Sequence, residues 1–144
     1  MLTVMHVLTE KGRTVHEIHP DATVFDALKL MAEHNIGSLA VLENGEIVGL
    51  ITERHYAREI VLKGRTSPGT RVRDIMSTKV AFALPDHTVE ECMAIMTAGA
   101  VRHLPVLEDG HLVGLVSIGD MVKSVIADQK FTIEQLELYF HGHR

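Results

Sequence analysis

The stretch Pro20-Asp-Ala-Thr-Val24 recurs as Pro85-Asp-His-Thr-Val89, 65 residues further along the chain. When that offset is kept, residues 20–55 align with residues 85–120 without a gap, and thirteen of the 36 aligned pairs are identical. Unrelated segments would agree at only about two of these positions, given ordinary residue frequencies. One supersecondary unit is therefore present twice. Because each copy is too small to bury its apolar face alone, we expect the two copies to pack on each other.

Each copy carries the signals of a helix followed by a β-hairpin and a second helix. Thr23 and Thr88 are hydroxyl N-caps with an acidic residue three positions later, and apolar residues at helical spacing follow them. An apolar run, an Asn-Gly or Asp-Gly turn and a second apolar run then indicate a hairpin. The pattern predicts hairpin strands at residues 39–42 with 47–51 and 104–107 with 112–116, second helices at residues 54–63 and 119–128, and short leading strands at residues 14–18 and 80–84.

These elements divide the chain into two repeats, at residues 8–64 and 72–130. Residues 65–71 between them are rich in Gly, Pro and Ser, which is typical of a linker. The last segment, residues 131–144, is predicted to form a short helix opened by Thr132 and a mobile tail.

Composition excludes several classes of function. The net charge of −5 and the aromatic content of 4% without tryptophan argue against a nucleic-acid-binding surface. A single cysteine, Cys92, excludes an internal disulfide and, with no secretory signal and no membrane-length apolar run, indicates a cytoplasmic protein. Ten histidines raise the question of a metal, but His141 and His143 at the tail have no supporting partner, so no metal site is predicted.

Four motifs carry a family resemblance. They are Gly49-Leu-Ile-Thr52 followed by Glu-Arg-His55, Gly114-Leu-Val-Ser117 followed by Ile-Gly-Asp120, His103-Leu-Pro-Val106 and Asp74-Ile-Met-Ser77. Together they resemble a tandem pair of cystathionine-β-synthase (CBS) domains, also called a Bateman module, of the small stand-alone type. The likeness covers roughly residues 8–128.

The resemblance implies an α/β fold of two βαββα repeats, packed through their sheets around a pseudo-two-fold axis. It also implies a homodimer and a sensor of an adenosine ligand, with AMP expected first and ATP, NAD or S-adenosylmethionine as the other candidates. Since the repeats use almost the whole chain, we expect the module to act on a separate protein.

The second repeat is predicted to hold the better nucleotide site. The carboxylate of Asp120 can accept both ribose hydroxyl protons, with the hydroxyl of Ser117 beside it. The resemblance places Arg102 and His103 at the phosphates, and arginine binds phosphate through two parallel hydrogen bonds. The competing interpretations are that Asp120 only caps a helix and that Arg102 and His103 form a solvated loop pair. The other residues expected around this site are Lys79, Val80, Val101, Leu104 and Pro105.

The first repeat departs from the family pattern. Thr52 keeps the hydroxyl, but His55 stands where the family has Asp, and a neutral imidazole accepts only one hydrogen bond. Arg54 can compensate by reaching a phosphate. Three alternatives therefore remain open for the first site: it is vacant, it binds the same ligand as the second site, or it binds another part of a larger ligand such as NAD. The remaining differences are Gly37 and Ser38 in place of Arg102 and His103, and Ala40 in place of Pro105.

Three functions remain open at this point. The first is a ligand-gated regulatory module, and the second is a structural dimerisation module with a vestigial pocket. The third, a small nucleotide-processing enzyme, is disfavoured because no nucleophile–base set and no phosphate-binding glycine loop occur in the sequence. We therefore expect a protein without catalytic activity.

Overall fold

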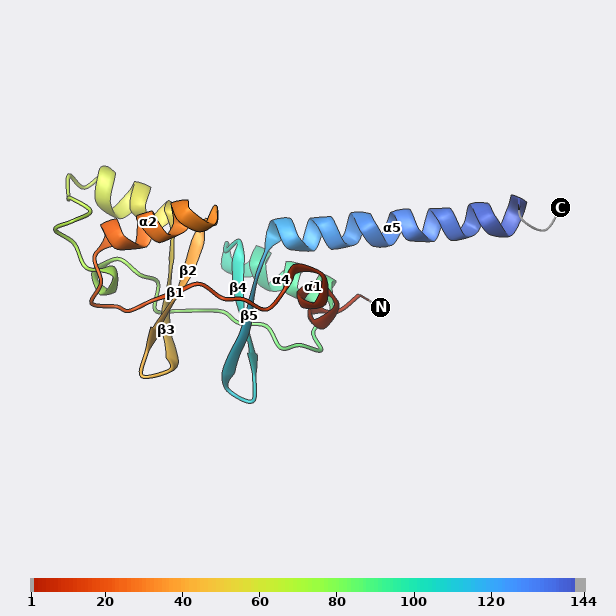
Figure 1. Cartoon of the computed structure of the whole chain (residues 1–144), viewed down its shortest axis with the longest axis horizontal. Coiled ribbons are helices and arrows are strands. Elements are labelled where there is room, and N and C mark those ends of the chain that lie inside the picture. Colours follow the sequence, from red (N-terminus) through yellow and green to blue (C-terminus); the bar gives the residue numbers. More distant parts are fainter. Residues whose placement is uncertain (1, 142–144) are drawn as a thin grey trace.

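The computed structural model describes residues 2–141 and shows two small sheets, each with its own helices, arranged side by side (Figure 1). The predicted α/β class and the pair of similar repeats are confirmed. The predicted mobility of the tail beyond His141, and with it His143, lies outside the described residues. Over residues 2–141, no helix is long and apolar enough to cross a bilayer.

The first half contains a three-stranded sheet in the order β1-β2-β3, with β1 parallel and β3 antiparallel to β2. The Thr23 hydroxyl accepts a hydrogen bond from the Asp26 amide at 3.1 Å and begins α2, as predicted. Asn44 and Gly45 have positive φ values of 54° and 78°, which a tight hairpin turn requires. The elements are β1 (Glu17–Ile18), α2 (Val24–His34), β2 (Ser38–Glu43), β3 (Glu46–Thr52), α3 (Glu53–His55) and the π-helix η1 (Tyr56–Val61).

The second half repeats this pattern with a shorter sheet, the antiparallel pair β4-β5. The predicted leading strand at residues 80–84 is reduced to one parallel bridge between Ala83 and Val106, which matches the pairing of Ile18 with Val41 in the first half. The elements of this half are the 3-10 turn η2 (Val72–Asp74), α4 (Val89–Gly99), β4 (His103–Glu108), β5 (His111–Ser117) and α5 (Ile118–His141).

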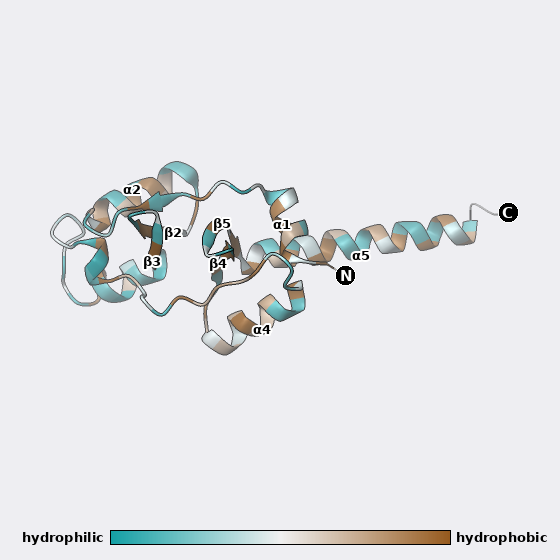
Figure 2. Cartoon of the chain, turned by 90° about the horizontal axis from the view of Figure 1, so that it is seen from below, coloured by the Kyte–Doolittle hydropathy of each residue, from teal (hydrophilic) through white to brown (hydrophobic). Residues whose placement is uncertain are grey.

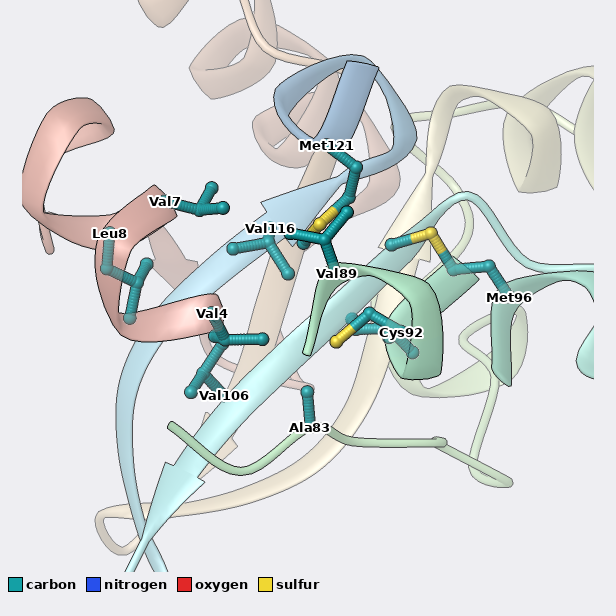
Figure 3. Packing of buried hydrophobic residues seen from close by; sticks show 11 residues of the cluster. Val4, Val7, Leu8, Ala83, Val89, Cys92, Met96, Val106, Val116 and Met121 are labelled. Atoms are coloured by element: carbon teal, nitrogen blue, oxygen red, sulfur yellow. The ribbon is translucent and has the colours of Figure 1, made fainter. Parts of the chain in front are cut away.

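An N-terminal helix that the sequence pattern did not predict, α1 (Val4–Lys11), closes the core of the second half. Val4, Val7 and Leu8 are buried there among side chains from α4, β4, β5 and α5 (Figure 3). Val72 and Ile75, at the start of the second repeat, are buried in the core of the first half. The start of the second repeat therefore completes the core of the first half, and α1 completes the core of the second half, which ties the two halves together.

The glycine that begins the family motif in the second hairpin strand of each repeat leaves space for the segment that packs on that strand. A Cβ atom on Gly49 would lie 2.9 Å from the backbone oxygen of Ser77 and 2.6 Å from the sulfur of Met76. A Cβ atom on Gly114 would lie 2.6 Å from the Leu8 side chain. The motif thus begins with glycine because another segment packs directly on the strand at that point.

Three predicted helices differ in detail from the structure. The second repeat ends in one continuous helix, α5, where two helices were predicted at residues 119–128 and 131–140. Thr132 does not cap a new helix, because its hydroxyl donates to the Asp128 carbonyl oxygen at 3.0 Å inside α5. No glycine or proline interrupts residues 120–141, so nothing in the chain ends the helix there. In the first repeat, the predicted helix at residues 54–63 begins as α3 and continues as the π-helix η1.

Candidate functional site

A cavity of about 270 Å³ opens between the two halves, at the end of the hairpins nearest to the helices. It is formed where β3 ends, where β4 begins, and where residues 77–81 cross between them. The Leu50 amide donates to the Ser77 oxygen at 3.0 Å and the Ser77 amide donates to the Leu50 oxygen at 2.9 Å, which fixes that crossing segment on β3. The cavity is lined by Gly37, Leu50, Thr52, Glu53, Arg54, His55, Ser77, Lys79, Val80, Ala81, Ala100, Val101, Arg102 and His103.

The lining combines an apolar part with charged side chains. Val80, Val101 and Leu50 provide the apolar surface. Arg54, Lys79 and Arg102 bring three positive charges, against the single carboxylate of Glu53. A cavity with this lining suits a flat apolar group that carries an anion.

Thr52 and His55 form a reciprocal capping pair at the end of β3. The Thr52 hydroxyl accepts from the His55 amide at 3.3 Å, and Nδ1 of His55 accepts from the Thr52 amide at 3.0 Å. Burial lowers the pKa of His55 below its ordinary value of 6.5, so the ring is neutral at neutral pH. Since Nδ1 is the acceptor, the proton is on Nε2, and His55 can offer a ligand one hydrogen-bond donor.

Asp120 and Ser117 repeat this capping pair in the second half. The Asp120 carboxylate accepts from the Ser117 amide at 2.8 Å, and the Ser117 hydroxyl accepts from the Asp120 amide at 3.1 Å. The same carboxylate also pairs with Nζ of Lys11, the last residue of α1, at 2.5 Å. Lys11 donates to the Leu115 carbonyl oxygen at 2.6 Å as well. Burial raises the pKa of Asp120, but the bonds from Lys11 and Ser117 outweigh it and lower the pKa overall.

His103 connects the cavity with the Ser117–Asp120 pair. It lines the cavity and is paired with Ser117 across the β4–β5 ladder. Burial, followed by the positive charge of Lys11, lowers the pKa of His103 below its ordinary value of 6.5. His103 is therefore a neutral group in this structure, whereas the neighbouring Arg102 carries the charge.

The cavity groups the predicted site residues differently from the two predicted sites. The cavity joins residues assigned to the first site, such as Thr52 and His55, with residues assigned to the second, such as Arg102 and His103. Ser117 and Asp120 do not line it, and the Asp120 carboxylate is bonded to the Ser117 amide and to Lys11. Four further residues lie elsewhere: Ser38, Ala40 and Leu104 are buried in the two halves, and Pro105 lines a smaller hollow with Val80.

Five lining residues were not predicted as site residues. Leu50 and Ser77 belong to motifs that carried the family resemblance, so their positions were available as a signal. Glu53 directly follows Thr52, and only its place in the cavity distinguishes it from a solvated helix-start carboxylate. Ala81 and Ala100 have no chemistry that a sequence pattern would single out.

Residues 7–62 and residues 72–127 each match the family model of the CBS domain. The chain belongs to the CBS-domain family. It is a CBS domain pair, a regulatory module, and the predicted resemblance is confirmed.

Relatives of this CBS pair come from plants, bacteria and archaea. The mitochondrial CBS domain-containing protein CBSX3 of Arabidopsis thaliana is 38% identical, over 97% of this chain and 72% of the relative. A putative signal-transduction protein with CBS domains from Burkholderia ambifaria MC40-6 is 51% identical, with a TM-score of 0.85 over 88% of this chain and 96% of the other. The CBS domain pair of protein MJ0100, solved in complex with 5-methylthioadenosine and S-adenosyl-L-methionine, is 22% identical, with a TM-score of 0.79 over 89% and 98%. At that identity the likeness shows the fold alone.

Proposed function

We propose that this CBS pair binds one adenosine nucleotide in the cavity between its halves and thereby regulates a separate protein. The observation that supports this proposal is the combination of an apolar lining at Val80 and Val101 with positive charges at Arg54, Lys79 and Arg102. A purine ring fits the first part, and a phosphate fits the second. Arginine can hold phosphate oxygens through parallel hydrogen bonds, which lysine cannot do.

The size of the cavity favours a mononucleotide. Its volume of about 270 Å³ is just below the range of roughly 300–1,000 Å³ that small-molecule sites occupy. AMP is therefore our first candidate, ahead of ATP and S-adenosylmethionine. NAD would place only one of its two nucleotides here and would need a second opening for the other.

Sugar recognition in this cavity differs from the predicted chelation by Asp120. His55 offers a donor through Nε2, and Glu53 is the carboxylate on the cavity wall that can accept hydroxyl protons. We propose that Glu53 and the Thr52 hydroxyl contact the ribose, while Arg102 and Arg54 contact the phosphate. His103, which is neutral, completes the phosphate end as a hydrogen-bond donor.

Regulation requires that the nucleotide favour one arrangement of the module over another. Both halves contribute to the cavity wall, so a ligand that draws Arg102 and Arg54 together changes how the halves meet. We propose that a homodimer of this chain presents that change to a partner protein in the cytoplasm and that the module itself catalyses no reaction. The plant relative is named as mitochondrial, so the compartment is part of the proposal and not of the family assignment.

Thermal unfolding with added ligand tests the proposal. A ligand at 100 times its dissociation constant stabilises the native state by about 2.7 kcal/mol, which corresponds to a rise in Tm of roughly 5–11 °C for a chain of this size. We expect this rise with AMP, and a smaller rise with adenosine, which lacks the phosphate. If AMP, ATP, NAD and S-adenosylmethionine all leave Tm unchanged at millimolar concentration, the cavity is not a nucleotide site.

A second candidate is a structural dimerisation module with a vestigial pocket, and the Lys11–Asp120 pair favours it. Lys11 occupies the carboxylate that the family pattern assigns to a ribose, 109 positions away in the sequence. A nucleotide at Asp120 would have to displace that ammonium group. Titration therefore separates the candidates, because a vestigial module binds no nucleotide in either half.

The same pair yields a prediction about stoichiometry. Replacing Lys11 with methionine is expected to release Asp120, so that calorimetric titration with AMP finds a second, weaker binding equivalent beside the first. The physical reason is that a carboxylate with one remaining backbone partner can accept ribose hydroxyl protons.

A matched control is Lys63→Met, which removes the same charge from an ion pair with Glu59 remote from both places. This control is expected to keep the stoichiometry of the unaltered chain. A Lys11→Met protein that still binds a single equivalent with unchanged affinity would show that Lys11 does not compete with ligand.

A further inference from the structure

The C-terminal part of α5 leaves the body of the molecule. Every residue from Ile126 to His141 is exposed, whereas Met121 and Ser124 at the base of the same helix are buried. Figure 1 shows this part extending beyond all other elements along the long axis of the molecule. We refer to residues 126–141 as the arm.

The arm is too apolar for a helix surrounded by water. Figure 2 shows hydrophobic and hydrophilic residues alternating along its whole length. At roughly 100 Å² for a half-exposed large side chain, seven such residues together present about 700 Å² of apolar surface, distributed around the helix. They are between 52% and 64% exposed: Ile126, Phe131, Ile133, Leu136, Leu138, Tyr139 and Phe140.

One stripe of the arm has the spacing of a helix–helix seam. Its positions alternate in steps of four and three residues, which is the heptad repeat of two helices that pack along their length. The stripe continues onto the body through Val122, which is 44% exposed. Charged residues that include Lys130 and Glu137 flank it on one side. In order, the stripe consists of Val122, Ile126, Gln129, Ile133, Leu136 and Phe140.

We propose that the arm pairs with the arm of a second copy of this chain, stripe against stripe. Two stripes, with five apolar side chains each, together present about 1,000 Å² of apolar surface, which is the lower limit for a specific protein interface. A two-fold symmetric pair uses the same patch on both copies, and this stripe is one patch with one repeat. Gln129 is the polar member that fixes the register of such a seam. The pairing is independent of the nucleotide proposal, because no arm residue lines the cavity.

The distance between two spin labels tests the pairing in the full-length protein. Lys130, beside the stripe, is replaced by cysteine and labelled. Cys92 is buried and its burial raises the thiol pKa to about 11, so the unaltered chain should take up no label. Because packed helices lie about 8–10 Å apart, we expect a label–label distance below about 30 Å in pulsed electron spin resonance.

The pair Ile133→Glu and Ala127→Glu makes the test specific. Both positions are exposed on the arm, but only Ile133 belongs to the stripe. In the labelled chain we expect Ile133→Glu to abolish the short distance and to weaken self-association at least tenfold in sedimentation equilibrium, whereas Ala127→Glu preserves both. Absence of any short distance in the parent labelled chain overturns the pairing and leaves the arm to a different protein. A short distance that survives Ile133→Glu overturns it equally.

Discussion

Replacing Gly49 with alanine is expected to lower the free energy of unfolding by about 2 kcal/mol, within the range of roughly 1–3 kcal/mol for overpacked sites. The added Cβ would lie 2.9 Å from the Ser77 backbone oxygen, and a backbone atom cannot turn away as a side chain can. The Leu50–Ser77 hydrogen bonds next to it would be strained as well. For a chain of this size we expect Tm to fall by roughly 4–8 °C, measured by scanning calorimetry.

Two other glycines give the matched series for this measurement. Gly114→Ala meets only the flexible Leu8 side chain, at 2.6 Å, and is expected to cost less than Gly49→Ala. Gly119→Ala meets its nearest atom, Oγ of Ser117, at an ordinary 3.6 Å and is expected to leave the stability unchanged or slightly raised. Equal stability of the Gly49 and Gly119 variants would show that the crossing segment is not packed tightly on β3. A loss of nucleotide binding in Gly49→Ala alone would follow from the same displacement, since Ser77 lines the cavity.

The parts of the fold that the sequence predicted are those encoded within a few residues. Thr23 and Thr88 mark helix starts through bonds to amides three positions later, and Asn44-Gly45 marks a turn through its backbone preference. Helix α1 escaped prediction although Thr3 caps it in the same way, because the residue three positions on is His6, not an acid, and because this segment lies outside the aligned repeat. The continuation of α5 through Thr132 was not predicted, because the sequence does not distinguish a threonine that caps a new helix from one that donates back to a carbonyl oxygen, as Thr132 does to Asp128.

The sequence patterns and the family resemblance identified nine of the fourteen residues that line the cavity, but they did not predict how those residues group in space. Thr52 and Ser117 directly follow the predicted strands at residues 47–51 and 112–116, and each is the last residue of its strand in the structure. Which strand end faces which crossing segment depends on how the two repeats pack around the pseudo-two-fold axis. Aligning the repeats along the chain gives only the equivalent position in the other repeat, and not the spatial neighbour. The cavity instead unites Thr52 of one half with Arg102 of the other, across the axis. Lys11 shows the same limit, because its contact with Asp120 spans 109 positions.

Replacing Arg102 with alanine is expected to weaken AMP binding by about 10- to 150-fold, because a hydrogen bond to a charged group contributes roughly 1.5–3 kcal/mol. Arg102 lies at the cavity wall and its side chain is exposed, so its loss should not disturb the core. Adenosine serves as the internal comparison, since a ligand without phosphate should bind both proteins equally in calorimetric titrations.

Two further variants separate charge, geometry and general damage. Arg102→Lys keeps the charge but not the planar fork, so we expect an intermediate affinity for AMP. Arg65→Ala removes an equal charge from the exposed linker and should leave the affinity unchanged. If Arg102→Ala weakens adenosine as much as AMP, Arg102 supports the cavity wall and does not contact the phosphate. If it weakens neither, the phosphate lies nearer Arg54 and Lys79, the other two positive charges of the cavity. The comparison of AMP with adenosine therefore shows where in the cavity the phosphate binds. The proposed role of the positive charges between the two CBS domains depends on that position.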